Sequence, residues 1–140
     1  MTRPDLRAAI ADFERWHQDP RNRRCHDLGI PLITLAALGL LARAPIDLGL
    51  ALLATSFALD LWLEKRLALA VLAVGLALWA AGRALPAWGL GASFALGWVL
   101  QLLGHRAFEK NAPAFTTNLA HLAVGPRWLV NRWFRVLGDR

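Results

Sequence analysis

An apolar run from Leu28 to Leu103, broken only by short clusters of charges and turn residues, constrains this 140-residue chain more than any other feature. Those clusters divide the run into four segments of similar length, roughly Leu28–Ala42, Leu48–Leu63, Leu67–Ala81 and Trp88–Leu103. A buried four-helix bundle in a soluble protein is the alternative, but no polar face repeats along the segments. Together with a hydrophobic content of 56%, the pattern predicts an all-α integral membrane bundle of four short transmembrane helices.

The predicted spans are short for a lipid bilayer. Each holds about 15 residues, or roughly 23 Å of helix at about 1.5 Å per residue, against a hydrocarbon core of about 30 Å. We therefore expect the helices to extend through their charged ends, or the bilayer to thin around them.

The distribution of basic residues predicts the orientation of this single membrane domain. It is divided into an N-terminal segment (1–27), the spans (28–103) and a C-terminal tail (104–140). With four spans, one side of the membrane holds both termini and the Glu64–Arg66 connection. Of the sixteen Lys and Arg residues, only Arg43 and Arg83 fall on the other side. Cytoplasmic segments carry the basic excess, so both termini are predicted to be cytoplasmic. The net charge of +6 is interpreted as contact with membrane lipid headgroups rather than with nucleic acid.

The tail after the last span is predicted to form two helices that do not cross the membrane. Pro113 is placed at the start of the first, which runs through Ala123 and ends at Gly125-Pro126. The second, Arg127–Leu137, has three polar residues four apart, beginning at Arg127. That spacing predicts an amphipathic helix lying in the cytoplasmic interface.

All four histidines flank the apolar run. His17 and His26 precede it, and His105 and His121 follow it. An even number of crossings brings all four to one face of the membrane. Imidazole is the commonest metal-binding side chain, so the arrangement suggests a metal site at a membrane surface. A single histidine at an interface is more often a polar side chain among headgroups, and a noncatalytic membrane scaffold therefore remains an open alternative.

Side chains that could orient these imidazoles lie at helical spacing from them. An amide precedes three of the histidines by three or four residues, and Glu109 continues the line beyond His105; the amides are Asn22, Gln101 and Asn118. Imidazoles that bind metals need a partner on the other ring nitrogen, which these residues are predicted to supply. A helix break at Pro20 would let His17 and His26 face the same site.

Two stretches of sequence carry a family resemblance. The first is His17-x4-Asn22-x3-His26-x2-Gly29-Ile30-Pro31. The second is Trp98-x2-Gln101-x2-Gly104-His105-x2-Phe108-Glu109-Lys110-Asn111-x-Pro113-Ala114, followed by Asn118 and Gly125-Pro126. Together they resemble the small membrane family of 2-hydroxy fatty acid dioxygenases, and the resemblance covers nearly the whole chain.

The resemblance implies a bacterial inner-membrane enzyme that uses Fe2+ for α-oxidation. A 2-hydroxy fatty acid and dioxygen would give a fatty acid one carbon shorter and carbon dioxide. His17, His26 and His105 match the motif histidines of the family, and His121 matches less closely. All four are expected to line the site as catalytic and metal-binding residues. The carboxylate of the substrate is expected to be bound by basic residues at the interface: Arg24, Arg106 and Lys110. The oligomeric state is left open, a homo-oligomer included.

The residues alone leave the metal and the reaction open. Zinc held by the same ligands would make the chain a membrane lipid hydrolase instead of an oxygenase, since histidine-rich sites accept both metals. An ion-conducting role is disfavoured because Asp60 is the only acidic residue well inside a span, and we place it near the cytoplasmic end.

Overall fold

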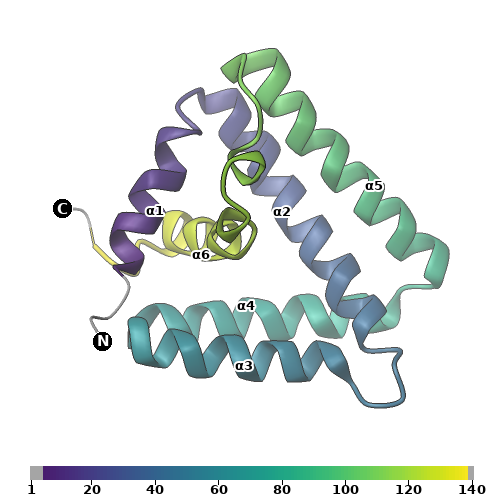
Figure 1. The fold of residues 1–140 in the computed structure, drawn as a ribbon. Helices are drawn as coiled ribbons and strands as arrows, with labels where there is room; N and C mark the ends of the chain where they lie inside the picture. Colours follow the sequence, from purple (N-terminus) through teal and green to yellow (C-terminus); the bar gives the residue numbers. More distant parts are fainter. Residues whose placement is uncertain (1–4, 139–140) are drawn as a thin grey trace.

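The computed structural model describes residues 5–138, apart from the side chain of Ala114, and this part of the chain is entirely helical (Figure 1). Arg3 and Arg140, which belong to the charge count above, lie outside the described residues. The described part of the chain contains six α-helices, with a π-helical turn η1 and a 3₁₀ turn η2 between the fifth and the sixth. In chain order they are α1 (Leu6–Arg15), α2 (Pro20–Leu41), α3 (Leu48–Leu63), α4 (Lys65–Ala84), α5 (Ala87–Leu103), η1 (Gly104–Glu109), η2 (Ala114–Thr116) and α6 (Ala120–Phe134).

All four apolar segments form helices, and three of them are long and apolar enough to cross a membrane. These three are α2, α4 and the continuous helix Ala87–Glu109 formed by α5 and η1, while α3 has 16 residues. Each long helix extends beyond its apolar segment. Helix α2 starts at Pro20 because the Asp19 side chain accepts a hydrogen bond from the Arg21 backbone N–H, at 2.8 Å.

Helix α2 is central, and it approaches its neighbours through glycine. Against α5, a Cβ atom added to Gly97 would lie 2.9 Å from the Gly29 carbonyl oxygen. Seven residues along both helices, a Cβ atom on Gly104 would overlap the Asn22 side chain. Against α4, a Cβ atom on Gly39 would lie 2.7 Å from the Gly82 carbonyl oxygen. Small residues permit such close backbone contact, which is the usual way apolar helices associate in membranes.

Helices α2 and α4 diverge from their contact near Gly39, and α1 and α6 fill the open side between them (Figure 1). Leu67 of α4 and Trp128 of α6 form the centre of the core here, with Phe13 of α1 packed against them. Helix α1 was not predicted from the sequence. Its apolar residues, Leu6, Ile10 and Phe13, do have helical spacing.

The prediction of two tail helices was wrong. Residues 120–134 form the single helix α6, with Gly125 and Pro126 inside it, and Pro113 precedes only the turn η2. Gly-Pro is a local stop signal, but the buried face of α6, including Trp128 and Leu129, packs along α1 and α4. Tertiary packing therefore overrides the local signal.

The connections between the apolar helices lie at different ends of the molecule. The α2–α3 and α4–α5 connections lie together at one end of the molecule, whereas the α3–α4 turn lies near the described ends of the chain (Figure 1). Side chains join the first two connections: Arg43 donates to the Leu85 carbonyl, and Asp47 accepts from the Trp79 indole at 3.1 Å and pairs with Arg83 at 3.6 Å.

An ion pair buried among the apolar helices fixes α6 against α3. Arg127, predicted on the polar face of an interfacial helix, is buried instead. It donates from Nε to Asp60 Oδ1 at 2.6 Å and from Nη2 to Ser56 Oγ at 2.8 Å. Its Nη1 donates to the Ala123 carbonyl at 2.5 Å, close to the gap that Pro126 leaves in the helix. Asp60 has no exposed surface, and Arg127 is its ion-pair partner.

Replacing Asp60 by leucine should lower the free energy of unfolding by about 3–5 kcal/mol, because the charge of Arg127 would remain buried without a partner. Unfolding of detergent-solubilised protein by SDS, followed by tryptophan fluorescence, measures this. Asp27→Leu is the matched control; it removes the partner of Arg132 in a partly exposed pair and should cost less than about 1 kcal/mol. The double variant Asp60→Leu/Arg127→Met should recover most of the loss. Equal losses for the two single variants would contradict this account.

Candidate metal centre

Three of the four histidines converge from three separate elements. His17 follows α1, His26 lies in the second turn of α2, and His105 lies in η1. Their exposed fractions are only 1%, 2% and 1%, and one nitrogen from each ring lies within 4.8 Å of the others. Within residues 5–138 this is the one group of three or more potential ligands that could hold a metal ion. The Nε2 atoms of His17 and His26 are 3.0 Å apart.

The hydrogen bonds of the three rings leave a nitrogen lone pair free on each. Nδ1 of His17 contacts the Phe13 carbonyl at 2.6 Å, and Nδ1 of His26 contacts the Asn22 carbonyl at 3.0 Å. Nδ1 of His105 contacts Asn111 Oδ1 at 2.8 Å. An oxygen acceptor places the proton on Nδ1, so Nε2 carries the lone pair in each neutral ring. The close pair of Nε2 atoms then has no proton to share, and a cation bound by both would relieve the repulsion.

Burial keeps His17 in the form that a metal ligand requires. It lowers the pKa of the imidazole to about 4, with the Phe13 hydrogen bond opposing the effect. The ring is stacked on Phe13, with the centroids 4.2 Å apart, and Trp128 lies beside it. His17 is therefore neutral near pH 7 and held rigidly between two aromatic side chains.

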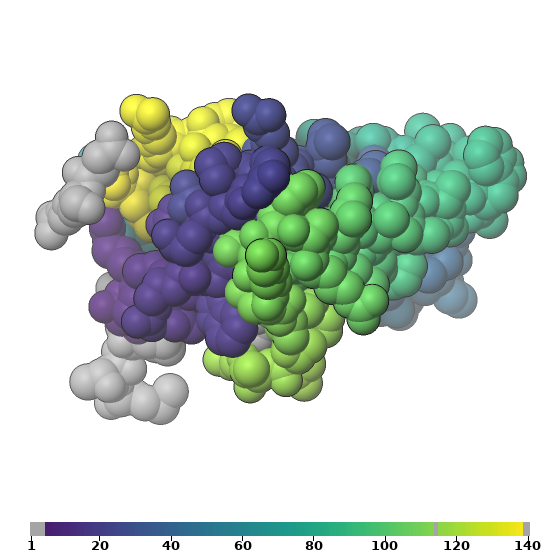
Figure 2. Space-filling model, turned by 90° about the horizontal axis from the view of Figure 1, so that it is seen from above, coloured from purple at the N-terminus to yellow at the C-terminus, as the bar shows by residue number. Residues whose placement is uncertain are grey.

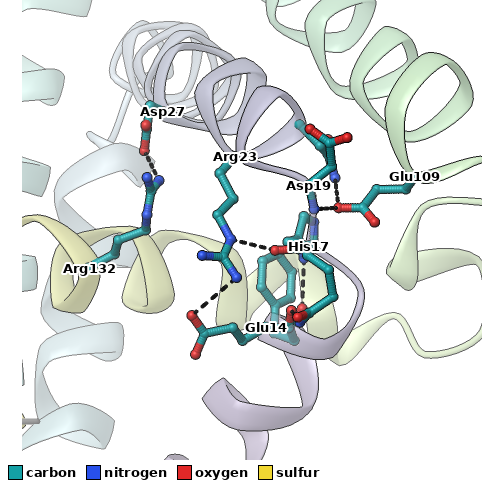
Figure 3. Close-up of polar contacts among 10 residues, drawn as sticks. Glu14, His17, Asp19, Arg23, Asp27, Glu109 and Arg132 are labelled. Atoms are coloured by element: carbon teal, nitrogen blue, oxygen red, sulfur yellow. Dashed lines mark hydrogen bonds and ion pairs between the residues drawn. The ribbon is translucent and has the colours of Figure 1, made fainter.

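Glu109 ties together the backbone segments that carry the histidines (Figure 3). Its Oε1 accepts from the Asp19 backbone N–H at 2.7 Å and from Asn22 Nδ2 at 3.1 Å. These bonds join the end of η1 to the start of α2, and Figure 2 shows the green chain near residue 110 beside the dark blue start of α2. On the other side, Arg23 donates to the His17 carbonyl at 2.5 Å.

The structure separates the predicted partners of the histidines. Asn22 accepts from His26 Nδ1 through its backbone carbonyl oxygen, and Glu109 accepts from the Asp19 backbone N–H and from Asn22 Nδ2 instead of from an imidazole. Gln101 makes no hydrogen bond to a histidine, and its Nε2 is buried without a partner. Asn118 is exposed, and its Oδ1 accepts from the Ala120 backbone N–H at 3.0 Å, at the start of α6.

A cavity that is open to the surface extends from the three rings. All four histidines line it, and most of the remaining wall is apolar, including Phe13, Ile30, Ile33, Trp98, Phe115 and Leu122. His121 stands apart from the trio: its Nε2 contacts Asp12 Oδ2 at 3.0 Å, and its Nδ1 is buried without a partner. The basic residues expected to bind a carboxylate, Arg24, Arg106 and Lys110, are exposed and do not line the cavity.

Two residues with clear roles were not assigned from the sequence. Asn111, which orients His105, belongs to the quoted motif, and its position there was the available signal. Asp12, which holds His121, lies on the unpredicted helix α1, so no pattern connected the two residues.

Fold and site together define a class: a helical membrane protein whose buried trio of imidazoles, at one end of a largely apolar cavity, could hold a metal ion. The chain belongs to the family described as "2-hydroxy-palmitic acid dioxygenase Mpo1-like", whose family model matches residues 5–136. It is 28% identical over 146 aligned residues to the 2-hydroxy-palmitic acid dioxygenase MPO1 of Saccharomyces cerevisiae, covering 96% of this chain and 82% of that protein. The family resemblance is thereby confirmed. No solved structure matches the chain.

The metal-free protein should lose stability as the pH falls from about 6.5 towards 4. In that window the unfolded chain protonates His17, whose usual pKa is 6.5, while the folded chain excludes the proton until about pH 4. This difference between the folded and unfolded pKa of His17 lowers the free energy of unfolding by about 3 kcal/mol once the pH is below both values. Thermal unfolding of chelator-treated protein measured across this range tests it, with His17→Phe as the variant that lacks the titrating group. A variant with the same pH dependence as the parent protein would contradict the assignment.

Proposed function

We propose that this protein is an iron(II)-dependent membrane dioxygenase that shortens 2-hydroxy fatty acids by one carbon. The observation that carries the proposal is the meeting of three neutral, buried imidazoles at one end of a largely apolar cavity. Membership of the family and the name of the yeast relative support a 2-hydroxy fatty acid as the substrate.

The reaction balances without an external reductant. A 2-hydroxy acid, R–CH(OH)–COOH, and dioxygen give R–COOH, carbon dioxide and water. The C1–C2 bond breaks, C2 is oxidised from an alcohol to a carboxylic acid, C1 leaves as carbon dioxide, and dioxygen is reduced. Substrate and dioxygen therefore suffice.

The family and the yeast relative are both named as dioxygenases, which favours iron over zinc because zinc has no redox chemistry. Iron(II) held by three protein ligands supplies open positions for substrate and dioxygen, and it supplies electrons to dioxygen.

The residues of the chain hold and position the reactants. His17, His26 and His105 would hold the ion, with their orientation fixed by the acceptors on Nδ1. The apolar wall of the cavity would take the acyl chain, where each buried CH2 contributes about 0.8 kcal/mol. A site at the end of membrane-length helices suits a substrate with a polar reactive head and an apolar tail.

We also propose that the site faces the cytoplasm at a bacterial inner membrane. The trio lies at the N-terminal end of α2 and the C-terminal end of α5, away from the α2–α3 connection, which contains Arg43, and from the C-terminal end of α4, which contains Arg83. The bias of basic residues supports a cytoplasmic location for the side that holds the trio.

The test is metal content together with turnover of 2-hydroxypalmitic acid by protein purified without oxygen or chelators. We expect about one iron per chain and release of a 15-carbon acid with carbon dioxide. In His105→Ala both should fall below detection while the protein still inserts into the membrane. His121→Ala should keep its iron, because His121 lies outside the trio.

The matched control is Leu103→Ala, which truncates an exposed side chain two residues before His105 and should leave metal and turnover unchanged. Zinc at one per chain without oxygen consumption would move the assignment to a lipid hydrolase. Full turnover by His105→Ala, or a protein that retains no metal even when iron(II) is supplied, would overturn the proposal.

Glu109 should influence the metal without touching it. Glu109→Ala removes the acceptor that joins η1 to α2 and should weaken iron(II) binding by about 10–100-fold. Glu109→Gln keeps an oxygen acceptor and should lose less. Titration of the stripped protein with iron(II) measures both, with Glu64→Ala, which removes the partly exposed pair with Arg7 away from the trio, as the control. Binding by Glu109→Ala as tight as by the control would contradict the positioning role.

A further inference from the structure

The wall of the cavity contains an amide donor with nothing to bind. Gln101 lies on α5, one helical turn before His105, and it lines the cavity with its Nε2 atom buried and unpaired. The residue is only 7% exposed. An unpaired buried amide destabilises a fold, and native structures hold few of them.

The packing around Gln101 is arranged to leave room for this amide. A Cβ atom on Gly29 would lie 2.9 Å from Gln101 Nε2 and 3.4 Å from its Cγ. Glycine on α2 therefore admits the amide between the two helices, and a larger residue would displace it. Gln101 and His105 are four residues apart, so their side chains lie on the same helix face, and both line the cavity.

The chemistry of the site indicates what this donor binds. An amide nitrogen donates two hydrogen bonds and accepts none, so its complement is a pure acceptor such as a carboxylate oxygen. Arg24, Arg106 and Lys110 are exposed and lie outside the lining of the cavity. Among the described lining residues Gln101 supplies the one amide, and it stands beside the histidine trio where the polar head of a fatty acid would lie.

We propose that Gln101 is the specificity residue for the carboxylate of the substrate. Its Nε2 donates to a carboxylate oxygen and holds the head of the acid against the three imidazoles, while the acyl chain lies along the apolar wall. The inference rests on the proposed function for the identity of the substrate. It replaces the expected role of Gln101 as a partner of a histidine.

The test compares two ligands that differ only at C1, 2-hydroxypalmitic acid and hexadecane-1,2-diol. Binding to the whole protein without oxygen is followed by quenching of tryptophan fluorescence, since Trp98 lines the cavity. The parent protein should bind the acid more tightly than the diol. Gln101→Leu should weaken binding of the acid by about 10–100-fold, as expected for a hydrogen bond to a charged group, and change binding of the diol by less than about threefold.

Stability provides a second readout. Gln101→Leu removes an unpaired buried amide at almost constant volume, so its midpoint of thermal unfolding should be unchanged or raised, and its iron content should match the parent protein. The control is Gln18→Leu, at the other glutamine of the chain, which is exposed and donates to the Glu14 carbonyl. It should leave both ligands unaffected.

Equal weakening of acid and diol in Gln101→Leu, or loss of its iron, would overturn the assignment, and so would a parent protein that does not prefer the acid. The proposed function is judged separately, by turnover of the parent protein when oxygen is admitted. A parent protein that binds the acid selectively through Gln101 but does not oxidise it would leave the carboxylate site standing and remove the dioxygenase.

Discussion

The close antiparallel contact of α2 with α5 determines where the chemistry of this protein can lie. Gly29 meets Gly97, and two turns along both helices Asn22 meets Gly104, so the same faces stay in register over the whole contact. A seven-residue interval on both helices keeps one stripe of each facing the other. That register brings His26 and His105 together at the polar end of the seam, and it brings Gly29 against Gln101 one turn further in. A shift of either helix by one residue would rotate these side chains away from the cavity.

The buried polar groups near the histidine trio differ in whether they have hydrogen-bond partners. The Nδ1 atom of each histidine in the trio has an oxygen acceptor, and Glu109 Oε1 accepts two hydrogen bonds. These groups therefore need no ligand to be satisfied. The side-chain atoms left without partners include Gln101 Nε2 and His121 Nδ1, both from residues that line the cavity. An unpaired buried group costs about 1–3 kcal/mol, which a ligand in the cavity would offset for these two atoms. The third unpaired atom, Asn22 Oδ1, lies against Gly104 in the helix seam and does not follow this pattern.

Sequence patterns predicted the parts of the fold that depend on hydrophobicity and charge. The apolar run forms four helices, α2 begins at Pro20, and the α2–α3 connection with Arg43 lies beside the end of α4 with Arg83. The histidines were expected on one face because an even number of crossings requires it, and all four line one cavity. The errors arose where distant contacts outweigh local signals. Gly125-Pro126 is a local signal for the end of a helix, but the pairing of Arg127 with Asp60 helps to keep α6 continuous. Asn111 contacts His105 only because the π-helical turn brings the two residues together. Helical spacing also could not show that Asn22 contacts His26 through its backbone carbonyl oxygen, or that Glu109 binds the start of α2 and not an imidazole.

The site is assembled from two parts that must dock. The α2–α5 seam supplies His26 and His105, whereas α1 leads into His17, and α1 is held against the membrane-length helices through α6. Phe13 and Trp128 enclose the His17 ring, and Trp128 lies in the same helix as Arg127, which reaches the buried Asp60 of α3. A chain of contacts therefore runs from an ion pair among the apolar helices to the ring that completes the trio. Because a metal ion would bind all three rings only in the docked arrangement, its binding energy would stabilise the docking of α1 and α6, and weakening of that docking would release the metal before the α2–α5 seam opened.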